Sequence, residues 1–215
     1  MLRTFTVIYF AVAIIGMALI HDAAQSAAKV SPNDRTPSGA VRASFQLVTL
    51  RDARQVRCSA THVGKGEFLT AAHCLGDYAG IVDGLFERPA TVVFSNTDYD
   101  VAIISVPSMK GKPSAPLTCE PLRIGQELEA IGRPYGFPPA HTWGKVASGL
   151  LAFPAGPDGY ALRAAVLVAF LIAPGSSGGM AVDHRGRVVA MTVATVEPFA
   201  LVVPASIICE LREKA

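Results

Sequence analysis

The sequence predicts an all-β fold of two packed antiparallel β-barrels, followed by one short C-terminal helix. The apolar segments are short, rich in Val, Ile, Ala and Phe, and bounded by Gly, Pro, Asn and Asp, which is typical of strands joined by turns. Helical periodicity is scarce. A stretch rich in Pro, Gly, Ser and Lys near the middle divides the strands into two groups. Each group has enough strands for one small closed sheet.

The first 28 residues are expected to be a secretory signal peptide. Arg3 precedes 14 uncharged residues, 7–20, a run shorter than the roughly 20 apolar residues of a membrane span. Small residues then offer a cleavage site after Ala28, with Ser26 and Ala28 at the recognised positions. A retained N-terminal anchor is the alternative. The mature chain, residues 29–215, is expected to be exported to a periplasm or secreted, without stable membrane association.

The remaining elements follow in chain order. Strands are predicted at 44–50, 58–63, 66–72, 90–95, 101–107, 127–134, 144–153, 160–169, 179–184, 187–195 and 200–204. These predict an N-terminal barrel over about 40–107, a connector over 108–116 and a C-terminal barrel over about 117–203. Residues 183–187 are expected to form a hairpin turn, with Gly186 at the position of positive φ. A helix is predicted over about 205–213, with Pro204 as its starting residue.

The charge balance excludes one class of partner. The chain has 19 Lys and Arg against 17 Asp and Glu, a formal charge of +2, and no basic run interleaved with aromatic residues. Nucleic acid is therefore not expected as a partner.

The four cysteines are expected to form disulfides if the chain is exported, because an oxidising compartment favours them. Four cysteines permit three pairings. Cys58 and Cys74 are 16 positions apart, and closing this loop would stabilise the fold by about 3 kcal/mol. Cys119 and Cys209 would then remain. A zinc site from Cys58, His62, His73 and Cys74 is the alternative, but the spacing fits no usual zinc finger.

Three short stretches carry groups suited to nucleophilic catalysis. The segment LTAAHCL contains His73, and NTDYDVAIISV contains Asp100 immediately before an apolar strand. In APGSSGGMAV, Ser177 is surrounded by glycines, which allow a sharp turn that brings backbone N–H groups close to a substrate. The order is histidine, aspartate, serine.

These stretches resemble the three catalytic motifs of the trypsin-like serine proteases of chymotrypsin fold. TAAHC, DYDVAII and GSSGG correspond to the family's histidine, aspartate and serine motifs, and the spacing of Cys58 and Cys74 matches its disulfide around the histidine loop. The segment LRIGQELEAIGRPYG with GKVASG resembles the bacterial HtrA-type proteases, without a following PDZ domain. PNDR resembles the start of glutamyl-endopeptidase-like members.

The resemblance implies an active-site cleft between the barrels and a serine endopeptidase that acts on proteins or peptides. His73 would be the general base, Asp100 would orient it, and Ser177 would form the acyl-enzyme. The N–H groups of Gly175 and Ser177 would form the oxyanion hole. No metal or organic cofactor is implied, and the oligomeric state is not predicted.

Two departures from the family pattern bear on regulation and specificity. Ser176 stands where many animal members have the aspartate that pairs with a newly released N-terminal amine, so activity is expected once the signal peptide is removed. Leu171 falls at the pocket-base position of trypsin-type members. With no carboxylate there, a small or medium apolar residue is expected before the scissile bond. The strand residues Val193, Ala194 and Thr195 are expected to pair with the substrate backbone.

Two other functions fit parts of the same pattern. Gly175, Ser177 and Gly179 also satisfy the Gly-x-Ser-x-Gly elbow of α/β-hydrolases, but there the acid and histidine follow the serine. A catalytically inactive homologue that acts as a binding or scaffold protein is the remaining alternative.

Overall fold

The computed structural model describes residues 38–154 and 161–214, which form two antiparallel sheets and one α-helix. The first sheet contains β1 (Ser44–Arg51), β2 (Arg54–Gly64), β3 (Glu67–Thr70), β4 (Tyr78–Asp83), β5 (Phe86–Pro89), β6 (Thr91–Asn96) and β7 (Val101–Ser105). The second sheet contains β8 (Glu127–Gly132), β9 (Ala140–Lys145), β10 (Leu151–Phe153), β11 (Leu162–Val168), β12 (Met180–Val182), β13 (Val188–Val196) and β14 (Phe199–Pro204). The helix is α2 (Ala205–Glu213). The predicted signal peptide, residues 1–28, lies outside the described residues.

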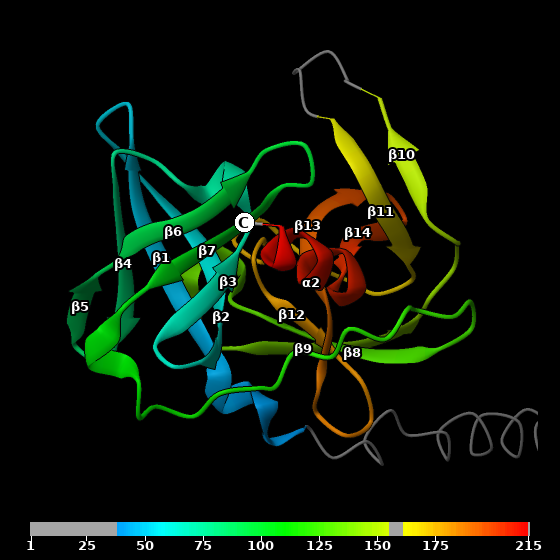
Figure 1. Ribbon diagram of the computed structural model, residues 1–215, viewed down its shortest axis with the longest axis horizontal. Helices are drawn as coiled ribbons and strands as arrows, with labels where there is room; N and C mark the ends of the chain where they lie inside the picture. The colour runs from blue at the N-terminus through cyan, green and yellow to red at the C-terminus, as the bar shows by residue number, and fades with distance from the viewer. Residues whose placement is uncertain (1–37, 155–160, 215) are drawn as a thin grey trace, which may run out of the picture. The chain divides into compact units, whose positions relative to one another are not determined.

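Each sheet has seven strands, and every pair of neighbouring strands is antiparallel. The strand order is β5-β4-β1-β2-β3-β7-β6 in the first sheet and β10-β11-β14-β13-β12-β8-β9 in the second. In Figure 1 the two sheets lie side by side, and α2 is seen in front of the second sheet. The predicted all-β fold class, with a short C-terminal helix, is confirmed.

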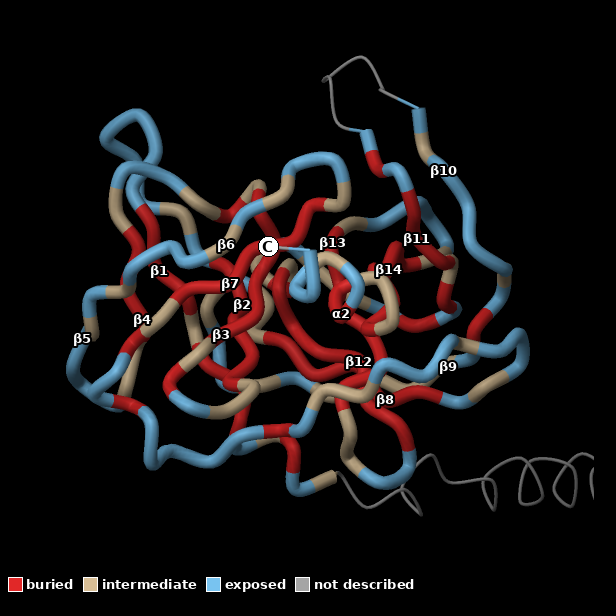
Figure 2. Tube along the Cα trace, in the orientation of Figure 1, coloured by how far each residue is buried: buried red, intermediate tan, exposed pale blue. Residues whose placement is uncertain are grey.

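The largest apolar core contains side chains from both sheets. Figure 2 shows that the buried parts of the chain are mainly strands, whereas the connecting loops are largely exposed. The first sheet contributes Phe45, Leu47, Phe68, Leu69, Ile81, Ile103 and Ile104, and the second contributes Leu162, Met191, Val193, Leu201 and Val203. Ile208 of α2 packs into the same cluster. Burial of these side chains therefore stabilises both sheets together.

The connector ties the two sheets to each other. The N–H of Ala115 donates to the carbonyl of His62 at 3.0 Å, and the N–H of Val188 donates to the carbonyl of Pro116 at 2.8 Å. Cys119, which follows, is joined to Cys209 of α2 by a disulfide. In the part of the chain that the structure describes, no helix has the length and apolarity needed to cross a membrane.

Two parts of the predicted strand pattern differ from the structure. The hairpin of β4 and β5 was not predicted, because Gly80 within the first segment and Gly84 directly after it indicate a loop. Gly80 lies within β4, and a Cβ there would press on the side chains of Tyr78 and Glu87. The single strand predicted over 144–153 is two strands, β9 and β10, separated by an irregular segment. Gly144 of β9 lets the carbonyl of Ala169 approach closely.

Candidate active site

His73 lies on a 3-10 turn, Ala72–Cys74, that follows β3 directly. Its backbone N–H donates to Oδ1 of Asp100 at 2.7 Å, and its ring Nδ1 lies 2.6 Å from Oδ2 of the same carboxylate. The side chain of His73 is 36% exposed, whereas that of Asp100 is 3% exposed. A carboxylate facing Nδ1 favours a proton on that nitrogen, which leaves Nε2 as the acceptor.

Asp100 ends the turn between β6 and β7. Its φ of 53° lies in the left-handed region, which aspartate tolerates better than most residues. Its N–H donates to the carbonyl of Thr97 at 3.3 Å, and its carbonyl accepts from the N–H of Ala72 at 3.2 Å. Backbone hydrogen bonds therefore hold the carboxylate against the turn that carries His73.

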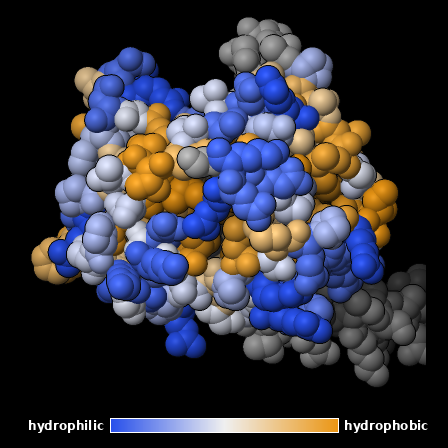
Figure 3. All heavy atoms as spheres, viewed as in Figure 1, coloured by the Kyte–Doolittle hydropathy of each residue, from blue (hydrophilic) through white to orange (hydrophobic). Residues whose placement is uncertain are grey.

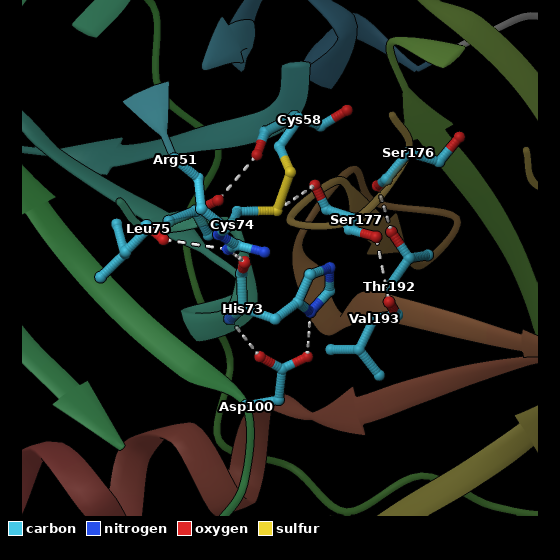
Figure 4. A network of polar contacts seen from close by, with 12 residues as sticks. Arg51, Cys58, His73, Cys74, Leu75, Asp100, Ser176, Ser177, Thr192 and Val193 are labelled. Atoms are coloured by element: carbon cyan, nitrogen blue, oxygen red, sulfur yellow. Dashed lines mark hydrogen bonds and ion pairs between the residues drawn. A yellow bond between two sulfur atoms is a disulfide. The ribbon is translucent and has the colours of Figure 1, made fainter. Parts of the chain in front are cut away.

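Two further contacts anchor the histidine turn. The disulfide between Cys58 and Cys74 joins the turn to β2. The guanidinium of Arg51, at the end of β1, donates to the carbonyls of His73 and Leu75. Figure 4 shows Arg51 and the disulfide next to the turn. Sequence reasoning did not predict the role of Arg51, since an exposed arginine at a strand end carries no local signal of such a contact.

Ser177 lies in the loop between β11 and β12. Gly175 and Gly178, on either side of it, have φ of 94° and 83°, which favour glycine. A Cβ at Gly178 would also collide with the carbonyl oxygen of Ser59. The Ser177 hydroxyl donates to the carbonyl of Val193 at 3.0 Å. In Figure 4 the imidazole of His73 lies between the Asp100 carboxylate and the Ser177 side chain.

The predicted oxyanion donors belong to peptide units whose carbonyls are hydrogen-bonded. The carbonyl of Pro174, which precedes the N–H of Gly175, accepts from the N–H of Tyr135 at 2.7 Å. The carbonyl of Ser176, which precedes the N–H of Ser177, accepts from the hydroxyl of Thr192 at 2.8 Å. Among the described residues, none accepts a hydrogen bond from the N–H of Gly175 or Ser177. Both N–H groups are therefore available to a ligand.

The predicted substrate-binding residues occupy different environments. Val193, Ala194 and Thr195 lie on β13, where a register shift between Thr192 and Ala194 interrupts the pairing with β14. Val193 is buried and its carbonyl faces Ser177. Leu171 is 78% exposed and lines a cavity of about 180 Å³ together with Thr142 and Ser176, so it stays a predicted pocket residue. The carbonyl of Leu171 accepts from the hydroxyl of Thr142 at 2.8 Å.

A cavity of about 630 Å³ opens beside His73 and Asp100. Phe153 and Leu162 form an apolar part of its wall. Asp98 and Arg163, which also line it, form an ion pair at 2.9 Å between the two sheets. On the face shown in Figure 3, apolar side chains gather around β10, where Leu150 and Leu151 are exposed. The wall of the cavity beside His73 is therefore partly apolar and partly charged.

The residues considered as zinc ligands do not form a metal site. Ligand atoms of Cys58, His73 and Cys74 lie within 4.8 Å of one another, but both sulfurs belong to a disulfide and supply no thiolate. His62 is fully buried elsewhere in the first sheet, with Nδ1 2.9 Å from the carbonyl of Pro113. Its Nε2 accepts from the N–H of Gly66 at 3.1 Å. His62 is therefore a hydrogen-bonded core residue.

Comparison with known proteins identifies the family of this fold and site. The profile of the trypsin-like peptidase domain matches residues 58–191, more than half of the chain. Protease Do-like 5, chloroplastic, of Arabidopsis thaliana is 32% identical over 113 residues, which cover 51% of this chain and 34% of that protein. The chain thus spans about a third of the length of this relative.

Solved structures share the fold at lower identity. The Rv3671c protease from M. tuberculosis, in its active form, has a TM-score of 0.73 and 19% identity, covering 86% of this chain and 93% of that one. The HtrA-type protease AlgW with a tripeptide has a TM-score of 0.69 and 22% identity, covering 81% of this chain and 60% of that one.

Proposed function

Because the chain belongs to the trypsin-like peptidase domain family, we propose that it is a serine endopeptidase that acts through His73, Asp100 and Ser177. One observation carries this proposal. Asp100 engages both the backbone N–H and the ring Nδ1 of His73, while Ser177 lies on the other side of the imidazole (Figure 4). This is the arrangement that a base needs to accept a proton from a serine hydroxyl.

The proposed reaction has two halves. Ser177 Oγ attacks the peptide carbonyl while its proton passes to Nε2 of His73, and the carbonyl electrons form the oxyanion. When this intermediate collapses, the C–N bond breaks and His73 gives the proton to the leaving amine. A water molecule then attacks the acyl-enzyme, and its proton passes through His73 to Ser177 as the carboxylic acid leaves. Asp100 stabilises the imidazolium at each step.

The serine hydroxyl has to change its partner before attack. It donates to the carbonyl of Val193 in the structure, and rotation about its Cα–Cβ bond would direct it to Nε2 of His73. The N–H groups of Gly175 and Ser177 would then bind the oxyanion, and losing one such donor typically costs about 3 kcal/mol.

Proteins or peptides are the proposed substrates, and a small or medium apolar residue is proposed before the scissile bond. The less buried end of β13, which includes Ala194 and Thr195, offers backbone groups for an extended substrate strand. No carboxylate stands at Leu171 to pair with Arg or Lys. The two disulfides support export to an oxidising compartment.

A serine-directed fluorophosphonate probe tests the proposal directly. The full chain is expected to be labelled, Ser177→Ala is expected to lose labelling, and Ser114→Ala, which changes an exposed connector serine, is expected to keep it. Hydrolysis of an unfolded protein substrate should likewise be seen for the wild type and Ser114→Ala and be lost in Ser177→Ala. Absence of labelling in the wild type, or labelling that survives Ser177→Ala, would favour the inactive homologue that acts as a binding protein.

A further inference from the structure

Two buried hydroxyl groups outside the proposed triad contact the backbone of the loop that carries Ser177. Ser59 lies on β2 of the first sheet and is fully buried. Thr192 lies on β13 of the second sheet and is 1% exposed. Each hydroxyl is hydrogen-bonded to a carbonyl of the segment 175–177.

Ser59 uses both hydrogen-bonding capacities of its hydroxyl. Its Oγ donates to the carbonyl of Gly175 at 2.8 Å and accepts from the N–H of Arg133 at 2.8 Å. The backbone N–H of Ser59 also donates to the carbonyl of Ser177 at 2.8 Å. Ser59 therefore links the first sheet to the Ser177 loop and to the loop after β8.

Thr192 holds the next peptide unit of the same loop. Its Oγ1 lies 2.8 Å from the carbonyl oxygen of Ser176 and 3.1 Å from that of Gly179. A hydroxyl has one proton, and the shorter distance favours donation to Ser176. Figure 4 shows this contact beside Ser177. The backbone of Thr192 makes two further hydrogen bonds, to Gly178 and Gly179.

These contacts determine where the predicted oxyanion donors point. In a trans peptide the C=O and the following N–H point in opposite directions. The Thr192 hydroxyl on the Ser176 carbonyl therefore sets the direction of the Ser177 N–H. On the other side, Tyr135 holds the Pro174 carbonyl, and Ser59 holds the Gly175 carbonyl. Tyr135 thus holds the peptide unit that carries the Gly175 N–H, whereas Ser59 holds the next peptide unit, between Gly175 and Ser176. Because Gly175 has no side chain to restrain its φ and ψ, the Ser59 hydrogen bond limits rotation at Gly175 from the other side.

We propose that Ser59 and Thr192 are positioning residues for an oxyanion-binding loop: Thr192 holds the peptide unit that carries the Ser177 N–H, and Ser59 holds the peptide unit after Gly175 and so limits rotation of Gly175. This proposal rests on the proposed serine endopeptidase function. Neither hydroxyl touches the reacting atoms. Their effect is on the transition state, because a preorganised donor stabilises the charge without having to reorient during the reaction.

The chain contains matched controls for both residues. The hydroxyls of Ser44 and Thr49 are also buried, on β1, and have no hydrogen-bond partner among the described residues. Ser44→Ala and Thr49→Val therefore remove the same atoms as Ser59→Ala and Thr192→Val, at sites away from the Ser177 loop.

The test measures kcat and KM for a peptide amide, and the inhibition constant of the corresponding peptide aldehyde, whose adduct with serine carries the oxyanion. Removing an oxyanion donor costs about 10²- to 10³-fold in kcat. Ser59→Ala and Thr192→Val leave the donor in place, so a loss of about 10- to 100-fold in kcat is expected, with KM within about twofold. Aldehyde binding should weaken by a similar factor. Thr192→Ser, which keeps the hydroxyl, should recover most of the activity, and both controls should match the wild type.

The outcomes separate this proposal from the proposed function. Lack of hydrolysis and of probe labelling in the wild type would contradict the function itself. An active wild type with wild-type kcat and aldehyde affinity in Ser59→Ala and Thr192→Val would overturn the positioning role. So would equal losses in Ser44→Ala and Thr49→Val. Thermal unfolding checks each variant, and if Thr192→Val does not fold, Ser59→Ala and Ser59→Gly decide the result.

Discussion

At the scale of single residues, Asp100 makes the contacts that are hardest to replace. Its two carboxylate oxygens accept from two different donors of His73, the backbone N–H and the ring Nδ1. An asparagine side chain has one acceptor oxygen and one donor NH₂ group, so it cannot accept both. The isosteric amide would therefore face one of these nitrogens with a donor.

Asp100→Asn is expected to lower kcat by about 10³- to 10⁴-fold, because the ring then adopts the wrong tautomer. Steady-state hydrolysis of a peptide substrate measures the effect. Asp77 is an exposed aspartate shortly after the turn that carries His73, and Asp77→Asn serves as the control. This control should change kcat by less than about twofold. An Asp100→Asn protein as active as the control would remove Asp100 from the proposed role.

Asp183 is another buried carboxylate and lies in the turn between β12 and β13. Burial by itself raises the pKa of Asp183, but hydrogen bonds from the backbone and side chain of Arg187 and from the backbone of Arg185 outweigh it and hold the pKa below the usual 3.8. The Arg187 Nε lies 2.8 Å from Oδ2. The ionised form therefore stabilises the turn between β12 and β13.

The folded protein is expected to lose stability as the solution is acidified below about pH 4, because Asp183 takes up its proton more readily in the unfolded chain. This contribution is fully present above the usual pKa and is lost as the pH falls through the lowered one. Urea unfolding from pH 6 to pH 2 measures it. Asp183→Asn should show a shallower acid dependence than the exposed control Asp52→Asn, and equal slopes would contradict the assignment.

At the scale of elements, the two disulfides anchor different parts of the molecule. Cys58–Cys74 attaches the histidine turn to β2, whereas Cys119–Cys209 attaches α2 to the segment after the connector. They close loops with sequence separations of 16 and 90. In the chain-entropy model such loops correspond to about 3 and about 4 to 5 kcal/mol of stability.

Replacing either pair by alanine is expected to lower the free energy of unfolding by up to these amounts, but only loss of Cys58–Cys74 should also lower kcat. The reason is that only this disulfide carries the turn of His73. Denaturant unfolding and peptide hydrolysis on Cys58→Ala/Cys74→Ala and Cys119→Ala/Cys209→Ala compare the two effects. The prediction is contradicted if both double variants lose the same fraction of kcat.

Local residue patterns predicted individual elements correctly, but they could not predict contacts between residues far apart in the chain. The hairpin turn at 183–187 was predicted from its turn residues, and Gly186 indeed has φ of 73°. The C-terminal helix was predicted from its apolar face and from Pro204, which is the residue just before α2. Motifs alone singled out His73, Asp100 and Ser177. By contrast, Ser59 and Gly175 are 116 positions apart, and no local pattern predicts their hydrogen bond.

At the scale of the whole molecule, the shared apolar core couples the two sheets. Phe68 and Ile103 of the first sheet belong to the same cluster as Met191 and Leu201 of the second. The hydrogen bonds of Ser59 and the guanidinium of Arg133, which donates to the carbonyl of Ser44 at 2.9 Å, cross between the same sheets. Burial lowers the pKa of Arg133 from its ordinary value. The described residues are therefore expected to unfold as one cooperative unit.

Trp143 allows this expectation to be checked, because it is the single tryptophan of the chain and lies on β9 of the second sheet. Its fluorescence reports on the second sheet, whereas far-ultraviolet circular dichroism reports on both. The two unfolding curves in urea should share one midpoint. A fluorescence transition displaced from the circular dichroism transition would mean that the sheets unfold separately.

The Ser59 contacts have a consequence for recombining this chain with its relatives. Ser177, the proposed nucleophile, follows β11 of the second sheet, but its loop is hydrogen-bonded to Ser59 of the first sheet. Neither half of the chain alone would therefore contain the complete proposed active site. A chimera that takes one half of the chain from a relative would keep each set of strands intact, but the hydrogen bonds between Ser59 and the Ser177 loop would join residues from different proteins. Such chimeras should fold but show low activity until Ser59 and its partners in the Ser177 loop come from the same protein.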